Sequence, residues 1–286
     1  LSAGADPGPA RYGRGGSQPT ITDANLALNR IPDAMLGGEL KLYRDRALEA
    51  LEKLGEPLGV AETAVELINV EMARAIRLVT VERGLDPSEF TLVAFGGAGP
   101  QHAVEVAEEM GIKRVVVPPH PEVFSALGLL MADWKFEARA SYPVDLEEAY
   151  TKLESQLAEK LGRVDYFVRL ADVRYRGQGW ELTVPVPRPA SFEGVKRVFE
   201  EKHEAVYGFK LDKPVEVVTV RVFAVIRRRK PVFRKPEPKG HVEPAGYRRV
   251  YTAGEWVTAA VYKRCELGTG ALVDGPAVIE EYGSTT

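Results

Sequence analysis

A strand, a glycine-rich turn, a helix and a second strand follow one another between residues 92 and 117, and no other stretch limits the possible folds so closely. The apolar run Leu92–Phe95 is short, which is typical of a buried parallel strand. Pro100 suits the first turn of the helix, Gly111 ends it, and Val115–Val117 is the returning strand. Parallel strands joined by a helix cross over in a right-handed sense in nearly all proteins. The pattern therefore predicts an α/β fold with a right-handed β-α-β unit.

The turn of this unit is the sharpest candidate for a binding site. Its run FGGAGPQH extends from Phe95 to His102. Bare backbone beside a helix N-terminus lets a phosphate or nucleotide approach free N–H groups and the positive end of the helix dipole. The run is no Rossmann fingerprint, because the third glycine of GxGxxG would fall on His102, and the sequence has no GxxxxGK(S/T) loop. On shape alone, a turn that contacts a nucleotide and a turn that is merely tight are equally well supported. The candidate cofactor-binding residues are Gly96, Gly97, Ala98, Gly99 and His102.

Other residues give weaker indications of chemistry. His102 lies near a helix N-terminus, where an imidazole tends to stay neutral, and it either donates to a ligand or satisfies backbone groups. The glycine-rich segment 4–16 carries Arg11 and Arg14, which could bind an anion, although a flexible loop explains the same composition. The histidines show no metal-binding spacing, no Ser/His/Asp set is recognisable, and the single Cys265 can form no internal disulfide. We therefore expect no metal site built from this chain alone and assign no catalytic residue.

The composition changes near residue 140, which divides the chain into two expected parts. Residues 1–140 form the α/β part, and residues 141–286 form an α+β region whose basic, proline-rich segment 227–240 is an extended linker. The run 215–226 is apolar on both faces, which predicts a central strand. Periodicity and capping residues predict a helix that begins at Thr22-Asp23 and further helices at 41–54, 60–82, 123–131, 146–161 and 192–207. Apolar patterns predict further strands at 180–186, 250–252, 256–262 and 277–281.

Charge and composition exclude several classes of partner. The 286 residues carry a net charge of −3 and a pI near 6.0, which gives no electrostatic reason to expect nucleic acid or an anionic membrane. No apolar run approaches the roughly 20 residues that span a bilayer, and nothing resembles a signal peptide, so we expect a cytoplasmic protein. Asn, Gln, Cys and Met are scarce and there are 20 prolines, which favours a thermophilic source. Because the chain begins with Leu1 and ends at Thr286 in an apparent strand or turn, we expect a fragment.

Motifs along essentially the whole chain, in the right order, resemble the hydantoinase A/5-oxoprolinase family. The stretches that carry the resemblance are SAGADPGPA from Ser2, YGRGG from Tyr12, PTITDAN from Pro19, ERGLDP from Glu82, AFGGAGP from Ala94 with His102-Ala103, SALG from Ser125, RYRGQ from Arg174, His203 with Tyr207-Gly208, and GPAVIEE from Gly275. Two features depart from the family pattern. The Asp-x-Gly-Gly-Thr phosphate motifs are absent, and Arg11 stands where the family often has cysteine.

The resemblance implies an actin-like (ribonuclease H-like) ATPase fold for residues 1–140, with Gly96–Gly99 as the loop near the adenosine. It implies that the full-length protein hydrolyses cyclic amides such as hydantoins or 5-oxoproline, with ATP, a divalent metal and a hydantoinase B-like partner subunit. The alternative enzyme is a subunit of an ATP-dependent acetone or acetophenone carboxylase. The alternative of another class is a non-catalytic module that docks the partner. Because the phosphate motifs are absent, we expect this chain alone to be inactive.

Overall fold

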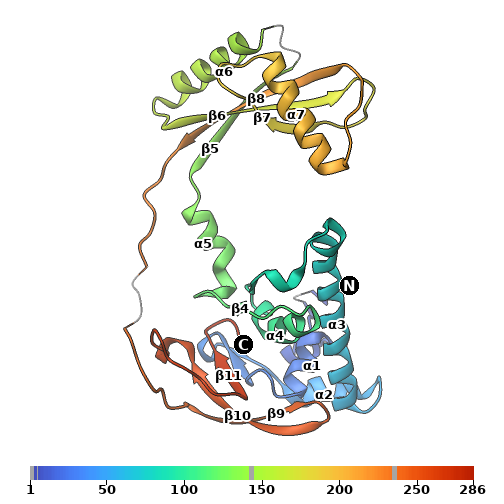
Figure 1. The fold of residues 1–286 in the computed structure, drawn as a ribbon. Helices are drawn as coiled ribbons and strands as arrows, with labels where there is room; N and C mark the ends of the chain where they lie inside the picture. The colour runs from blue at the N-terminus through green and yellow to red at the C-terminus, as the bar shows by residue number, and fades with distance from the viewer. Residues whose placement is uncertain (1–2, 5, 142–144, 234–236) are drawn as a thin grey trace. The chain divides into compact units, whose positions relative to one another are not determined.

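The chain packs into two compact units. The computed structural model describes residues 3–4, 6–141, 145–233 and 237–286. Unit 1 comprises Leu1–Gly128 and Val232–Thr286, and unit 2 comprises Leu129–Pro231 (Figure 1). This division differs from the one expected near residue 140, because the last segment of the chain returns to pack with the first. The expected linker at 227–240 spans the second boundary between the units, and its residues 234–236 lie outside the described residues.

Three helices form the first core of unit 1. They are α1 (Ile21–Ala27), α2 (Arg44–Glu52) and α3 (Pro57–Val79), with a short hairpin of β1 (Ala34–Met35) and β2 (Leu40–Lys41) between the first two. Helix α1 begins earlier than expected, because Thr20 and Asp23 form a reciprocal capping box. Buried apolar side chains of all three helices share the core: Ala24, Ala27, Leu28, Leu51, Ala61 and Val65.

The predicted β-α-β unit is present and contains β3 (Leu92–Val93), α4 (Gly99–Glu109) and β4 (Val115–Val116). Strands β3 and β4 pair in parallel, which confirms the parallel pairing, while the hand of the crossover stays a prediction. The inner face of α4 packs on α3 through a small core of Ala73, Ala107, Met110 and Ile112. Helix α4 therefore holds the glycine-rich turn against the helical core.

The end of the chain forms the strand-rich part of unit 1 that the sequence predicts. Strand β10 (Glu255–Lys263) pairs antiparallel with β9 (Gly246–Thr252) and parallel with β11 (Ala277–Glu280). The backbone N–H of Tyr251 donates to the carbonyl of Leu28 at 2.9 Å, so β9 docks directly on the end of α1. This contact explains why the segment after unit 2 belongs to unit 1.

Unit 2 is a four-stranded antiparallel sheet with two helices. The strand order is β5-β8-β6-β7, with β5 at Trp134–Ser141, β6 at Tyr166–Tyr175, β7 at Leu182–Pro185 and β8 at Val215–Ile226. The central place of β8 is confirmed, and so are helices α6 (Leu146–Leu161) and α7 (Phe192–Tyr207). Their buried side chains meet the sheet in one core whose largest members are Tyr150, Tyr175 and Phe199.

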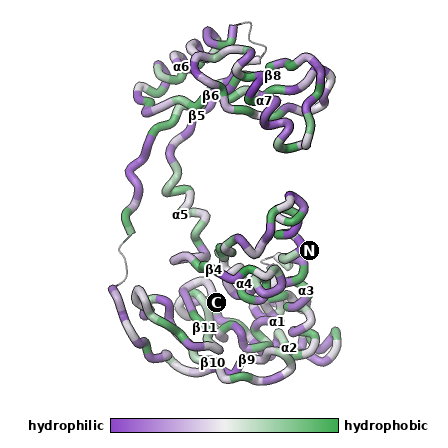
Figure 2. Tube along the Cα trace, in the orientation of Figure 1, coloured by the Kyte–Doolittle hydropathy of each residue, from purple (hydrophilic) through white to green (hydrophobic). Residues whose placement is uncertain are grey.

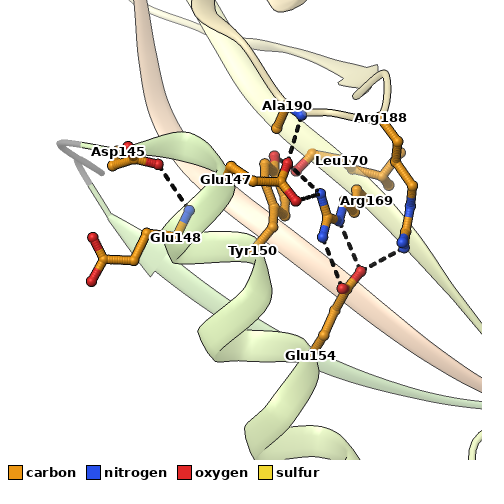
Figure 3. Close-up of polar contacts among 9 residues, drawn as sticks. All are labelled: Asp145, Glu147, Glu148, Tyr150, Glu154, Arg169, Leu170, Arg188 and Ala190. Atoms are coloured by element: carbon orange, nitrogen blue, oxygen red, sulfur yellow. Dashed lines mark hydrogen bonds and ion pairs between the residues drawn. The ribbon is translucent and has the colours of Figure 1, made fainter.

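A buried arginine organises the contact between α6 and the sheet of unit 2 (Figure 3). Arg169 of β6 contacts Glu154 through two nitrogens, each at 2.8 Å, and contacts Glu147 at 2.8 Å. Glu147 also accepts the backbone N–H of Ala190, and the hydroxyl of Tyr150 donates to the carbonyl of Leu170. The N–H of Ala190 and the Arg169 guanidinium lower the pKa of Glu147. The cation therefore has charged or polar partners on every side that the sheet does not cover.

Helix α5 (Phe124–Met131) is apolar, and none of its residues is buried. Figure 2 shows this short helix mostly in white and green. Its position agrees with the helix expected at 123–131. No helix in the described ranges is long and apolar enough to cross a membrane.

Candidate functional site

The glycine-rich loop Gly96–Gly99 joins β3 to α4 and exposes backbone donors. Gly96 has a φ of 88°, a value that favours glycine, and its N–H donates to the carbonyl of Pro121 at 2.7 Å. The N–H groups of Gly97, Ala98 and Gly99 have no acceptor among the described residues. Ala98 occupies the N-cap, where its methyl group can accept nothing. The start of α4 therefore offers neighbouring free N–H groups, the arrangement that suits an acceptor on a ligand.

A second wall of the loop comes from the end of the chain. A Cβ on Gly97 would lie 3.5 Å from the carbonyl oxygen of Gly283, and a Cβ on Gly283 would lie 2.9 Å from Cγ of Glu122. The turn after β11 therefore packs between the loop and Glu122. Neither Glu122 nor Gly283 is recognisable as a site residue from the sequence, because only the return of the C-terminal strands brings the two residues to the loop. The family motif GPAVIEE leads into this turn, and it is the feature of the sequence that could have pointed to the turn as part of the site.

Polar atoms around this wall are buried without partners in the described part of the chain. They include the Oε2 atom of Glu122, the Oγ atom of Ser284 and the Nε2 atom of Gln101. An unpaired polar group in a protein interior costs about 1 to 3 kcal/mol. These atoms belong to the second wall and to the first turn of α4, so a ligand at the loop could form hydrogen bonds with them.

An apolar cavity of about 310 Å³ adjoins the loop on the side of α3. It is lined by residues of α3, β3 and α4, among them Ile76, Phe95, Gly99 and His102. This volume is at the lower end of the range that small-molecule pockets occupy, about 300 to 1,000 Å³. The cavity has room for a flat ring next to the free N–H groups.

A larger cavity of about 1110 Å³ shares the second wall with the loop. Its lining includes His120, Phe124, Cys265 and Tyr282. The thiol of Cys265 is exposed, and no other described cysteine can pair with it. Two of the charged side chains at this cavity, Arg264 and Glu281, contact each other at 3.9 Å. The turn after β11 that packs against the loop therefore also contributes to this cavity, through Tyr282.

His102, the one candidate site residue with a polar side chain, lies in the interior. It is only 2% exposed, and its Nδ1 and Nε2 atoms contact Asn69 at 2.8 Å and Asn25 at 3.4 Å. Burial lowers the pKa of His102, with Glu105 raising it and Arg30 lowering it further. The histidine is therefore neutral near pH 7, as expected, but amide side chains take up both ring nitrogens. A direct contact between His102 and a ligand stays a prediction.

The arginine candidates of segment 4–16 separate in the structure. Arg11 is buried against Asp23 at 3.5 Å and donates to the hydroxyl of Thr20 at 2.8 Å. The segment is compact, because a Cβ on Gly16 would lie 1.9 Å from the carbonyl oxygen of Gly8. Arg11 is thus committed to the capping box of α1 and is unavailable to an external anion. Arg14 is exposed, and residue 5 of the segment lies outside the described residues.

Two family motifs come together within unit 2. Gln178 accepts the backbone N–H of Tyr175 and contacts Nε2 of His203 at 3.2 Å. His203 donates from Nδ1 to the carbonyl of Phe209 at 2.8 Å. Because every polar atom of this histidine is used to join the β6–β7 turn to the end of α7, the motif has a structural explanation. Trp180, expected within a strand, lies before β7 and is exposed.

The described residues hold no cluster that could bind a metal ion. No group of three or more His, Cys, Asp or Glu side chains converges in the described ranges. The described residues of the loop therefore offer free backbone donors, with no such cluster of metal-ligating side chains among the described residues.

Comparison with known proteins relates this chain to a set of ATP-dependent enzymes. It is 44% identical to an uncharacterized protein of Methanocaldococcus jannaschii over its whole length, which is 44% of that protein. It is 32% identical to the caprolactamase subunit alpha of Pseudomonas jessenii, and the match covers 98% of this chain and 45% of the relative. The chain thus spans less than half the length of these relatives.

Solved structures show the same relationship. A nucleotide-free acetone carboxylase matches all of this chain and 46% of its own with a TM-score of 0.81 at 25% identity, and the ATP-dependent caprolactamase matches with a TM-score of 0.73 at 31% identity. A hydantoinase/oxoprolinase family model covers residues 1–138, and the model of the C-terminal domain of the same family covers residues 135–286. The chain belongs to the hydantoinase/oxoprolinase family.

Proposed function

We propose that this chain is the part of an ATP-dependent cyclic amide hydrolase that holds the adenosine end of ATP. The observation that carries the proposal is the set of free N–H groups at Gly97, Ala98 and Gly99, exposed where α4 begins and bordered by a ring-sized apolar cavity. Backbone donors beside an apolar slot suit the acceptor nitrogens and flat face of a purine. ATP is the proposed nucleotide because two structural relatives are described as ATP-dependent.

Charge around the loop favours adenosine over phosphate at this place. Glu122 packs against the turn at Gly283, and Glu281 contacts the N–H of His120 at 3.4 Å. A triphosphate beside these carboxylates would meet like charge, whereas ribose hydroxyls can donate to them. The loop therefore holds the uncharged end of the nucleotide.

The phosphate and metal sites belong to another part of the longer protein. The parallel β3-α4-β4 unit is the element that an actin-like ATPase places next to adenosine, and we propose that fold for unit 1. Such an ATPase closes two halves over the nucleotide, and a divalent metal neutralises the phosphate charge. Because the metal in such an ATPase lies with the phosphates and not with the adenosine, we propose that its ligands come from a part of the whole protein other than this loop.

The proposed substrate is a cyclic amide. The caprolactamase relative acts on a lactam, and phosphorylation of an amide oxygen would make the carbonyl carbon easier to attack. The acetone carboxylase neighbour supports the alternative, in which ATP activates a ketone for carboxylation. The fold does not distinguish these chemistries. Since the caprolactamase relative is named as a subunit, we propose a hydantoinase B-like partner for the whole protein.

Nucleotide binding by this chain tests the proposal. Gly97 has no left-handed φ, and a Cβ there meets only the Gly283 carbonyl at 3.5 Å, so Gly97→Leu is compatible with folding while its side chain covers the free N–H groups. Titration calorimetry should show weak binding of ATP and of adenosine that Gly97→Leu abolishes. The matched control Gly240→Leu has open space around its Cβ and should bind as the wild type does.

Catalysis separates the enzyme from a docking module. The chain alone should not hydrolyse ATP, and a protein that also contains the preceding half should hydrolyse it when the partner subunit and a lactam are added. A natural full-length protein that binds its partner but never turns over ATP would favour the non-catalytic module.

A further inference from the structure

Five residues, linked by four side-chain contacts and one backbone hydrogen bond, form a closed ring beneath the glycine-rich loop. Arg30 contacts Glu105 at 2.8 Å, and Glu105 accepts from Nδ2 of Asn69 at 2.5 Å. The carbonyl oxygen of Asn69 and the amide nitrogen of Asn25 hold the two ring nitrogens of His102. The backbone N–H of Arg30 donates to the carbonyl of Asn25 at 2.9 Å, which closes the ring. The ring thus ties α1, α3 and α4 together.

The ring determines the protonation state of His102. Glu105 can only accept, so Asn69 must use its Nδ2 atom as the donor to Glu105 and present its oxygen to His102. Nδ1 of His102 therefore carries the hydrogen, and Nε2 must accept from Asn25. With the amide of Asn25 in this orientation, a second proton on Nε2 would face its N–H, so this arrangement fits the neutral imidazole. The charged groups that face the histidine are Glu105 on its own helix and Arg30 after α1, while α3 presents the uncharged Asn69.

The histidine lies three residues after the loop ends. Gly99 is the first residue of α4, so the side chain of His102 anchors the first turn whose N–H groups are free. Ala98, at the N-cap, makes no side-chain contact that could fix this turn from outside. The opposite side of the loop is held by one backbone hydrogen bond, from Gly96 to Pro121. The orientation of the free N–H groups therefore depends on the buried ring.

We propose that His102 is a positioning residue, which fixes the Gly96–Gly99 loop by bridging Asn69 and Asn25 and makes no hydrogen bond to the bound nucleotide, because both of its ring nitrogens are engaged. The inference rests on the proposed function for its consequence, nucleotide binding, but its structural part can be tested without any ligand. Neutral His102 holds the loop. Protonated or truncated His102 loosens the first turn of α4 from α1 and α3, while the apolar core of Ala73 and Ala107 still holds the rest of the helix.

Amide exchange measured by NMR tests the structural part. The N–H of Gly96 donates to Pro121 and the N–H of Gln101 donates to Ala98, so their protection factors report the loop and the first turn. His102→Ala should lower both factors by about fivefold to tenfold, the effect of losing a buried hydrogen bond, and Asn69→Ala should do the same. His241→Ala, which changes an exposed histidine of the same unit, should alter neither factor.

A conservative variant and a pH profile exclude a general loss of folding. The amide of His102→Gln can donate to Asn69 and accept from Asn25, so it should keep most of the protection. In the wild type, protection at Gly96 should fall as pH drops below about 6.5, where a histidine begins to protonate. In His102→Gln that pH dependence should disappear. Unchanged protection at Gly96 in His102→Ala would overturn the proposal, as would a pH profile that survives in His102→Gln.

ATP binding then separates positioning from direct contact. If His102 positions the loop, the losses of affinity in His102→Ala and Asn69→Ala should be alike, and the double variant should lose no more than either single one. If His102 instead donates a hydrogen bond to the nucleotide, only its own truncation weakens binding, which contradicts the inference. If wild type binds neither ATP nor adenosine, the proposed function fails, and the exchange series still decides whether His102 positions the loop.

Discussion

The two units bury polar networks of different kinds. In unit 1 the neutral His102 lies between two amides, and charge enters only at the rim through Arg30 and Glu105. In unit 2 the cation of Arg169 lies between two carboxylates, with the ring of Tyr150 5.1 Å from the guanidinium (Figure 3). The contacts of the first network fit a neutral His102, whereas the second network pairs a charged Arg169 with two ionised glutamates.

The difference indicates different roles. A buried ion pair costs much desolvation free energy and stabilises chiefly by excluding other arrangements, which suits a helix packed on a sheet. The neutral ring lies beside the candidate site, where a fixed charge would compete with the free N–H groups for the ligand. Unit 2 therefore resembles a scaffold, and unit 1 a binding element.

The largest effect should come from breaking the ionic network. Arg169→Met leaves Glu147 and Glu154 without their buried cation, and loss of one partner of a buried pair costs about 3 to 5 kcal/mol. Because Glu147 is 44% exposed and can turn to water, we expect the lower end of that range. Urea unfolding measures it, and Arg163→Met, which removes an exposed pair with Asp165, should cost less than about 1 kcal/mol. Equal losses of unfolding free energy in the two variants would show that the Arg169 network contributes no more than an ordinary surface ion pair.

A smaller loss should follow from opening the neutral ring. Asn69→Leu leaves Nδ1 of His102 without its acceptor in the interior, which costs about 1 to 3 kcal/mol. Exchange of backbone amides, read by mass spectrometry, should localise this loss to peptides of unit 1. Gln156→Leu, on the exposed face of α6, is the control and should leave both units unchanged. Loss of protection spread equally over unit 2 would show that the ring does not act locally.

The smallest effect is one of pH. Burial lowers the pKa of His102 from 6.5, so the unfolded chain takes up the proton first, and this contribution to stability is full above pH 6.5 and is lost as pH falls below it. The pKa of Glu147 is lowered from 4.5 by the N–H of Ala190 and by Arg169, so its contribution is lost only below pH 4.5.

Unit 1 should therefore weaken as the pH falls from about 6.5 towards 4.5, while the ionic network of unit 2 does not. Exchange mass spectrometry at several pH values, corrected for intrinsic rates, measures each unit in the same sample. His102→Gln should remove the step in unit 1. An equal loss of amide protection in unit 2 over this pH range would contradict the assignment of the pH dependence to His102.

Local patterns predicted the elements, and long-range contacts decided what they do. Helices α6 and α7 and strand β8 follow directly from periodicity and caps, and the parallel pairing of β3 and β4 follows from the strand–turn–helix pattern. The sequence of strand β6 shows no clear alternation of apolar and polar residues, because Arg169 occupies one of the inward positions. The partners of Arg169 lie on α6. An arginine reads as exposed until its carboxylates are known.

The candidate site divides in the same way. Composition and spacing identified the loop, because glycines next to a helix N-terminus are a local property. They could not reveal that Glu122 and Gly283 form its second wall, or that His102 faces inward, since these contacts join residues about 30 to 190 positions apart. The structural role of Arg11 likewise depends on its contact with Asp23, which the sequence does not reveal.

Binding of adenosine at the loop is the central claim, and an NMR titration tests it most directly. Adding ATP should shift the amide signals of Gly97, Ala98 and Gly99 in a saturable way, adenosine alone should shift the same signals, and inorganic triphosphate should not. Saturable shifts confined to other residues, or shifts at the loop caused by triphosphate and not by adenosine, would contradict the account.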